Sequence, residues 1–130
     1  MATHRILIVD DEPKISALIS FVLEQTKRFE VRCESRSALA LNAAREFRPD
    51  LVLLDVDMPG KDGGDVAAEI GKDPELSGVP ILFLTSLVSA AEAGEREVMK
   101  SGMPFLSKPV KVKVLIDTVD RLLASRIHAA

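Results

Sequence analysis

The chain has 130 residues, 47% of them hydrophobic and 28% charged, and a formal net charge of −3 at pH 7. This length fits one domain with a proper core over residues 1–130, and the acidic balance disfavours direct binding to nucleic acid, which usually needs a basic surplus. No run approaches the roughly 18 apolar residues of a membrane helix, and Met1 is not followed by a signal-peptide region, so we expect a cytoplasmic protein without a membrane partner.

Strands and helices are predicted to alternate five times along the chain. Short apolar or alternating runs predict strands over residues 6–9, 29–34, 51–56, 81–84 and 103–106. Apolar residues at helical spacing predict helices that begin near Pro13, span 38–47, follow Asp62 to about Ile70, span about 89–100, and cover about 115–123. This alternation favours right-handed parallel crossovers, and therefore an α/β fold in the form of a three-layer sandwich.

Single residues add detail at four positions. Pro13 suits the first turn of a helix, where its missing N–H costs nothing, and Asp62 suits the cap of the third helix. Gly94 weakens the helix predicted over 89–100 by roughly 1 kcal/mol relative to alanine, so we expect that helix to be the most mobile element. Cys33 is the only cysteine, which excludes an internal disulfide, and its alternating strand predicts a small core residue there.

Carboxylates follow the first and third predicted strands. Asp10 and Asp11 come directly after the first strand, and Asp55 lies near the end of the third. If the parallel sheet has the flavodoxin-like order 2-1-3-4-5, the ends of these two strands open on one crevice. Three carboxylates there would repel one another unless a hard divalent cation bound between them, and Mg²⁺ suits a few carboxylates and several waters. The sequence therefore predicts a magnesium site with Asp55 at its centre.

Thr85 and Lys108 lie at the ends of the fourth and fifth predicted strands, on the same edge of the sheet. A hydroxyl and an ammonium that face a metal-bound carboxylate form a pocket for a tetrahedral anion. Asp55 could then be the nucleophile of a phosphoryl transfer, a reaction in which electrostatic stabilisation supplies most of the catalysis.

These motifs resemble those of the response-regulator receiver domains of two-component signalling, over essentially all of residues 4–125. The matching segments cover residues 6–12, 53–63, 83–86 and 105–109. Each motif is weak alone, but the set is specific because the motifs follow in the right order and each lies at a predicted strand end.

The resemblance implies a role for each acid. Asp55 resembles the aspartate that takes a phosphoryl group from the phosphohistidine of a sensor kinase. Asp11 and Asp55 would give carboxylate oxygens to Mg²⁺, and Asp57 would give its backbone carbonyl. Asp10 would act mainly through a bound water.

The resemblance also implies a switch. Lys108 would pair with the phosphoryl oxygens, Thr85 would hydrogen-bond one of them on activation, and Phe105 stands at the position of the switch aromatic. The surface formed by the fourth helix, the fifth strand and the fifth helix would change as a result. Partners of this family usually bind there.

We interpret the chain as a phosphorylation-dependent switch that supports its own phosphotransfer and autodephosphorylation and is not a turnover enzyme. The expected partners are a sensor histidine kinase or phosphotransfer protein and a downstream protein, with homodimerisation through the face of the fourth and fifth helices left open. Two alternatives remain. Asp55 and Asp57 superficially resemble the nucleophile pair of haloacid-dehalogenase-like phosphatases, which would turn over a phosphomonoester. A pseudo-receiver would serve only as an interaction module, unaffected by Mg²⁺ and a phosphodonor.

Overall fold

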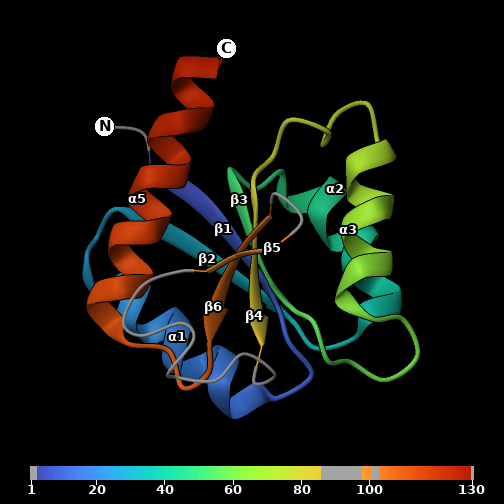
Figure 1. The fold of residues 1–130 in the computed structure, drawn as a ribbon, viewed down its shortest axis with the longest axis horizontal. Coiled ribbons are helices and arrows are strands. Elements are labelled where there is room, and N and C mark those ends of the chain that lie inside the picture. The colour runs from blue at the N-terminus through green and yellow to red at the C-terminus, as the bar shows by residue number, and fades with distance from the viewer. Residues whose placement is uncertain (1–2, 86–97, 101–102, 130) are drawn as a thin grey trace.

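The computed structural model describes residues 3–85, 98–100 and 103–129, which are organised around one six-stranded sheet (Figure 1). The strands are β1 (His4–Val9), β2 (Phe29–Glu34), β3 (Leu51–Asp55), β4 (Ile81–Thr85), β5 (Val98–Lys100) and β6 (Met103–Ser107). The helices are α1 (Pro13–Gln25), α2 (Ala40–Phe47), α3 (Gly63–Lys72) and α5 (Val112–Ala129), and the short 3-10 helix η1 (Ser37–Leu39) precedes α2.

The strands lie in the order β2-β1-β3-β4-β6-β5, and the first five of these are parallel. The fifth predicted strand is β6, so the predicted parallel order and the flavodoxin-like three-layer fold are confirmed. β1 and β3 are neighbours at the centre of the sheet, with Val9 opposite Leu54. Their carboxyl ends therefore open on the same edge, which is where ligands bind in folds of this class.

One edge of the sheet differs from the prediction. Residues 98–100, expected to end the helix over 89–100, form β5 and pair antiparallel to β6, with Lys100 opposite Met103. The helix prediction was wrong for these residues, because apolar spacing over so short a segment does not distinguish a helix from a strand. The rest of that predicted helix, and its expected mobility, lie outside the described residues.

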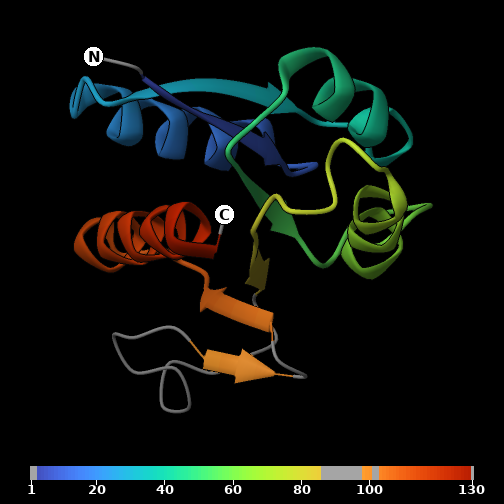
Figure 2. The ribbon, with the colours of Figure 1, turned by 90° about the horizontal axis from the view of Figure 1, so that it is seen from above.

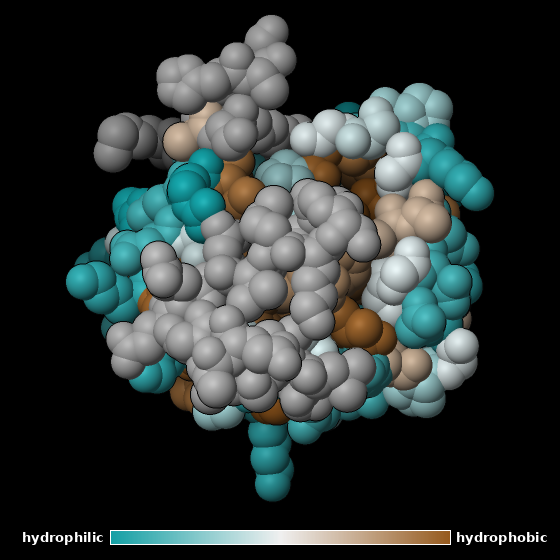
Figure 3. Space-filling model, in the orientation of Figure 1, coloured by the Kyte–Doolittle hydropathy of each residue, from teal (hydrophilic) through white to brown (hydrophobic). Residues whose placement is uncertain are grey.

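Helices cover both faces of the sheet, with α1 and α5 on one face and α2 and α3 on the other (Figure 2). Side chains alternate along β1, so that Leu7 and Val9 pack on the side of α2 and α3, and Ile6 and Ile8 pack on the side of α1 and α5. All four are fully buried, which explains the continuous apolar run. The outer side over α3, on the right in Figure 3, is largely hydrophilic.

Two predictions at helix starts are confirmed. Pro13 is the first residue of α1, and Oδ1 of Asp62 caps α3 by accepting a hydrogen bond from Asp65 N at 2.9 Å. Oδ2 of Asp65 accepts in turn from Asp62 N, which completes a capping box. Within the described ranges, no helix combines the length and the apolar character that crossing a membrane requires.

Cys33 was predicted in the core, and this prediction was wrong because the residue is exposed. β2 is an edge strand, and near its carboxyl end the neighbouring side chains of α1 are the small ones of Ser16 and Ala17. These residues line, with Cys33, an open cleft of about 240 Å³. An alternating pattern identifies the inner face of a strand, but small neighbours can leave that face open.

Candidate functional site

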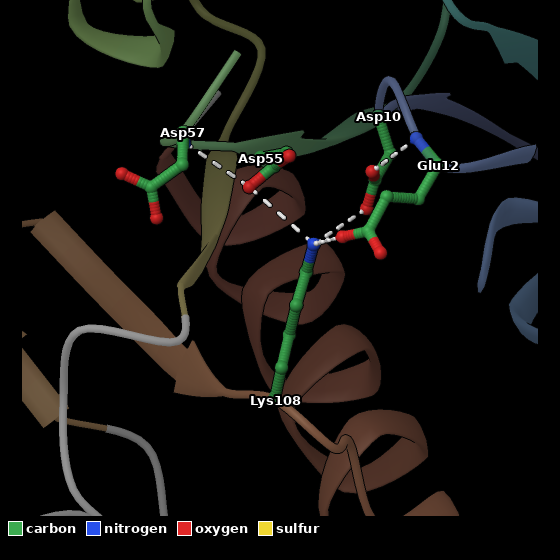
Figure 4. A network of polar contacts seen from close by, with 5 residues as sticks. All are labelled: Asp10, Glu12, Asp55, Asp57 and Lys108. Atoms are coloured by element: carbon green, nitrogen blue, oxygen red, sulfur yellow. Dashed lines mark hydrogen bonds and ion pairs between the residues drawn. The ribbon is translucent and has the colours of Figure 1, made fainter.

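Three side chains from separate strands meet at the carboxyl edge of the sheet (Figure 4). Asp10 follows β1, Asp55 ends β3 and Lys108 follows β6. Nζ of Lys108 lies 3.0 Å from Oδ2 of Asp10 and 3.4 Å from Oδ1 of Asp55. Asp10 is fully buried, Asp55 is 2% exposed and the lysine side chain is 11% exposed. The structure thus brings together two acids and a lysine that are far apart in the sequence.

The backbone orients both acids. Oδ1 of Asp10 accepts a hydrogen bond from Glu12 N at 2.9 Å, and Oδ1 of Asp55 accepts one from Asp57 N at 3.1 Å. In both cases the carboxylate accepts from the N–H two residues further on, a turn that aspartate favours. Each acid is therefore held by the turn that follows its own strand.

The start of α3 packs directly against the end of β3. The N–H of Gly63 donates to the carbonyl of Val56 at 3.1 Å. A Cβ at Gly63 would lie 2.6 Å from the backbone oxygen of Asp55, closer than real Cβ atoms approach. Glycine is required here because its backbone comes so close to the acid's own backbone.

Charge and burial perturb the acid at the centre. Burial, followed by the negative charge of Asp10, raises the pKa of Asp55 from its ordinary 3.8 to about 7. The N–H of Asp57 and the charge of Lys108 offset only part of this rise. Burial lowers the pKa of Lys108, but its close contacts with Asp10 and Glu12, together with the charges of Asp10 and Asp55, outweigh burial and raise that pKa to about 12. The lysine therefore stays a cation among acids that repel one another.

The acids offer a set of oxygens that suits a hard divalent cation. Asp10, Asp11, Glu12 and Asp55 each place one carboxylate oxygen so that all four lie within 4.8 Å of one another. Oδ2 of Asp10 is buried and accepts no hydrogen bond of regular geometry, although Lys108 Nζ lies 3.0 Å away. Oxygen ligands of this kind are those that Mg²⁺ prefers, so the donor set fits the ion that the sequence predicted.

Thr85 lies one strand away from Asp55. It ends β4 and is buried, and β4 pairs with β3 so that Leu84 is opposite Asp55. The carbonyl of Thr85 accepts a hydrogen bond from the N–H of Lys108 at 2.9 Å. The strand ends that carry the hydroxyl and the ammonium are thus joined at the same edge as the acids.

Phe105 and Asp57 lie near this edge of the sheet, in β6 and just after β3. Phe105 is half-buried in β6 and stacks on Phe83 of β4, with ring centroids 4.9 Å apart. Both rings pack on the side of the sheet that α2 and α3 cover. Asp57 is exposed, and its carboxylate points away from Lys108 (Figure 4). Its N–H holds Asp55, while its side chain takes no part in the network drawn there.

Glu12 contacts the lysine, although its sequence position predicted no role for it. Its Oε1 accepts a hydrogen bond from Lys108 Nζ at 3.1 Å, and its side chain is 56% exposed. The available signal was the run of three acids after the first strand, of which only Asp10 and Asp11 received a role.

Comparisons with known proteins place these observations in a family. Residues 6–120 match the response regulator receiver domain. The chain is 37% identical over 122 residues to the DNA-binding response regulator MtrA of Mycolicibacterium smegmatis, covering 89% of this chain and 49% of MtrA, so it spans about half the length of that relative. It is 32% identical over 123 residues to the protein PilH of Pseudomonas aeruginosa, covering 92% of this chain and 98% of PilH.

A solved structure agrees with this assignment. The chemotaxis protein CheY4 of Vibrio cholerae has a TM-score of 0.78 with this chain at 27% identity, covering 93% of this chain and 99% of that one. An aspartyl phosphate and a Mg²⁺ ion at an acidic pocket are typical of the family that the sequence matches, which serves signalling rather than metabolic turnover. This chain belongs to the response regulator receiver domains of two-component signalling.

Proposed function

We propose that residues 1–130 form one receiver domain that switches state when Asp55 accepts a phosphoryl group. The observation that carries this proposal is the position of Lys108. Its ammonium lies 3.4 Å from the Asp55 carboxylate at the carboxyl edge of the sheet, where both side chains are largely shielded from solvent. A carboxylate fixed beside a permanent cation is suited to phosphoryl transfer, because that reaction depends chiefly on positioning and charge stabilisation.

The donor is a phosphohistidine on a sensor histidine kinase or a phosphotransfer protein. A carboxylate oxygen of Asp55 attacks the phosphorus, a new oxygen–phosphorus bond forms, and the phosphorus–nitrogen bond breaks with its electron pair returning to the histidine. Lys108 then pairs with the phosphoryl oxygens, and the hydroxyl of Thr85 hydrogen-bonds one of them. Loss of the phosphoryl group to water, supported by the same residues, resets the switch.

Mg²⁺ would be held at the acidic end of this site. Asp11 and Asp55 would give carboxylate oxygens, Asp57 would give its backbone carbonyl, and Asp10 would act through a water. The ion would supply positive charge beside the phosphoryl oxygens. It would also relieve the repulsion between Asp10 and Asp55 that is reflected in the raised pKa of Asp55.

Phosphorylation would be transmitted to the protein surface through β6, the strand that carries Phe105. When Thr85 turns toward the phosphoryl group, Phe105 fills the vacated space, and the surface that includes β6 and α5 changes its affinity for a downstream protein. Homodimerisation through this region remains a prediction, as does the cytoplasmic location. We propose no contact of this chain with nucleic acid, although the relative MtrA is named as DNA-binding.

An apolar surface beside the site is suited to the phosphodonor protein. Three large apolar residues are exposed here: Leu18 (64%) and Phe21 (61%) of α1, and Val112 (50%) of α5. A groove of about 170 Å³ between α1 and the start of α5 is lined by Leu18 and Val112 together with Lys108 and Pro109. A donor that covers this groove would stand next to the lysine that borders Asp55, and exposed apolar surface of this kind marks interaction sites.

Family membership bears on the two alternatives. The phosphatase alternative loses its basis, because the Asp55–Asp57 pair belongs to a receiver-domain match over residues 6–120. The pseudo-receiver alternative is tested by the phosphorylation experiment itself, since it predicts a protein that a phosphodonor leaves unmodified.

The test is intact-mass measurement after incubation with acetyl phosphate and Mg²⁺. We expect one phosphoryl group on the wild type, none on Asp55→Asn, and a strongly reduced yield when EDTA replaces Mg²⁺. Asp62→Asn is the matched control, because it removes an acid from the next loop while asparagine still caps α3. A phosphoryl group that persists in Asp55→Asn, or a wild type that takes none, would overturn the proposal.

A further inference from the structure

The ammonium of Lys108 is surrounded by carboxylates before any phosphoryl group arrives. A lysine has three N–H donors. Its Nζ lies 3.0 Å from Oδ2 of Asp10, 3.1 Å from Oε1 of Glu12 and 3.4 Å from Oδ1 of Asp55 (Figure 4). Among these described contacts, the one with Glu12 is a hydrogen bond of regular geometry. A phosphoryl oxygen on Asp55 that accepts from the ammonium would compete with these partners for its donors.

The three carboxylates differ in the cost to the protein when the ammonium moves away from them. Asp10 is fully buried, so it would remain as an unpaired charge inside the protein, whereas Asp55 gives up its own carboxylate charge when it is phosphorylated. The side chain of Glu12 is 56% exposed and can turn into water. Because water can solvate its carboxylate after release, Glu12 is the partner that costs least to release.

The backbone of Glu12 is fixed, while its side chain serves only the lysine among the contacts described. Its N–H donates to Asp10 at 2.9 Å, and it directly precedes Pro13, the first residue of α1. Its side chain makes no capping hydrogen bond to that helix. The carboxylate can therefore change partner without moving either the strand end or the helix.

We propose that Glu12 is a positioning residue that holds Lys108 toward the end of β1 in the unphosphorylated protein and releases it when Asp55 is phosphorylated. The proposal rests on the proposed function of Asp55 as phosphoryl acceptor. Glu12 and the phosphoryl group then compete for the same ammonium, so Glu12 slows phosphorylation and disfavours the phosphorylated state. Lys108 contacts the reacting atoms, whereas Glu12 acts only through Lys108.

Glu12→Gln tests this competition, because it removes the charge and keeps the size of the side chain. In saturating Mg²⁺ with acetyl phosphate, we expect the rate of phosphorylation, followed by intact mass, to rise about two- to fivefold, the range expected for an ion pair whose carboxylate is exposed. Glu34→Gln is the matched control, because it removes an acid at the end of β2 that hydrogen-bonds Arg36 N instead of the lysine. Its rate should stay close to that of the wild type.

The same substitution in a Lys108→Met background separates positioning from a general effect of charge. If Glu12 acts through Lys108, the ratio of the rates with and without Glu12→Gln falls to about one in this background. A ratio that is equally large in both backgrounds would overturn the proposal, because the missing charge would then act directly on the donor or the ion. An unchanged or slower rate for Glu12→Gln alone would also overturn it.

A second readout needs no phosphorylation. In protein labelled with ¹³C-lysine, we expect the ε-methylene signal of Lys108 to shift in Glu12→Gln and to stay in place in Glu34→Gln. A wild type that takes a phosphoryl group while Glu12→Gln changes neither signal nor rate would contradict the role of Glu12 alone. A wild type that takes no phosphoryl group would overturn the proposed function and the release of Lys108 with it, and a shifted signal would then reflect a purely structural ion pair.

Discussion

The interior residues of β3 and its last residue are both buried, but their burial has opposite effects on the stability of the folded state. Residues 51–54 are fully buried apolar side chains between two layers of helices, and Asp55, the next residue, is 2% exposed. Burying Leu54 removes apolar surface from water and stabilises the fold. Burying Asp55 takes a carboxylate out of water beside Asp10 and raises its pKa to about 7, which is a cost to the folded state.

The same contrast is found in β1, where the buried run from Ile6 to Val9 leads into the buried acid Asp10. Stability is therefore concentrated in the strand interiors, and unfavourable electrostatic free energy is concentrated at the strand ends. That free energy favours binding of a cation or a change of charge at the end of the strand. Substitutions on the two sides of this boundary should consequently have effects of opposite sign.

The largest effect is expected from Leu54→Ala, which opens a cavity in the core. Leu54 is fully buried in the cluster with α2 and α3, so the substitution should lower the free energy of unfolding by about 3 kcal/mol. Urea unfolding followed by far-UV circular dichroism measures this loss, because the chain has no Trp and no Tyr for fluorescence. Leu18→Ala is the control at a side chain that is 64% exposed and should change stability by less than about 0.5 kcal/mol. Similar losses of unfolding free energy in Leu54→Ala and Leu18→Ala would contradict the stabilising role assigned to the strand interior.

Gly63→Ala should disturb the boundary itself. Its Cβ would lie 2.6 Å from the backbone oxygen of Asp55, so the strand end or the start of α3 has to move, at a cost of about 1–3 kcal/mol. The displaced acid should also be phosphorylated more slowly by acetyl phosphate. Gly71→Ala is the control in the same helix, because a Cβ there meets nothing within 4 Å, and it should gain up to about 1 kcal/mol. A Gly63→Ala protein with wild-type stability and rate would show that the close approach is unimportant.

Asp55→Asn should stabilise the protein in the absence of divalent cations, in a way that depends on pH. The pKa of Asp55 is raised to about 7 in the folded state, so between about pH 4 and pH 7 the folded state binds more protons than the unfolded state. The wild type therefore loses stability as the pH rises through this window, and the variant does not. Thermal unfolding in EDTA should show a gain of about 1–2 kcal/mol for Asp55→Asn at pH 8 and almost none near pH 4. A variant less stable than the wild type at pH 8 would contradict the assigned cost of burying this acid.

The smallest effect is expected at an ion pair on the surface. Arg28 and Asp120 are joined at 2.7 Å, but their side chains are 50% and 42% exposed. Arg28→Ala should therefore lower the free energy of unfolding by less than about 1 kcal/mol, and the difference should shrink in high salt. A loss as large as that of Leu54→Ala would mean that charge pairs stabilise this fold as much as its core does.

The strand ends were predictable because their acids follow apolar runs directly. Asp10, Asp55 and Lys108 each come after such a run, and parallel strands of one sheet place those ends together. Two features of the structure could not be predicted from runs and spacing in the sequence. The contact between Glu12 and Lys108 joins residues 96 positions apart, and spacing within a motif does not encode it. The exposure of Cys33 depends on which side chains of α1 lie next to it, which a strand pattern alone does not specify.

The most direct test of the central claim locates the phosphoryl group at the boundary residue itself. Borohydride reduces an aspartyl phosphate to homoserine, so protein treated with acetyl phosphate and Mg²⁺ can be reduced, digested and mapped by peptide mass. The account predicts homoserine at position 55 and unmodified aspartate at Asp10, Asp11 and Asp57. Homoserine at any of those three positions, or an unmodified Asp55 in protein that has gained a phosphoryl group, would contradict it.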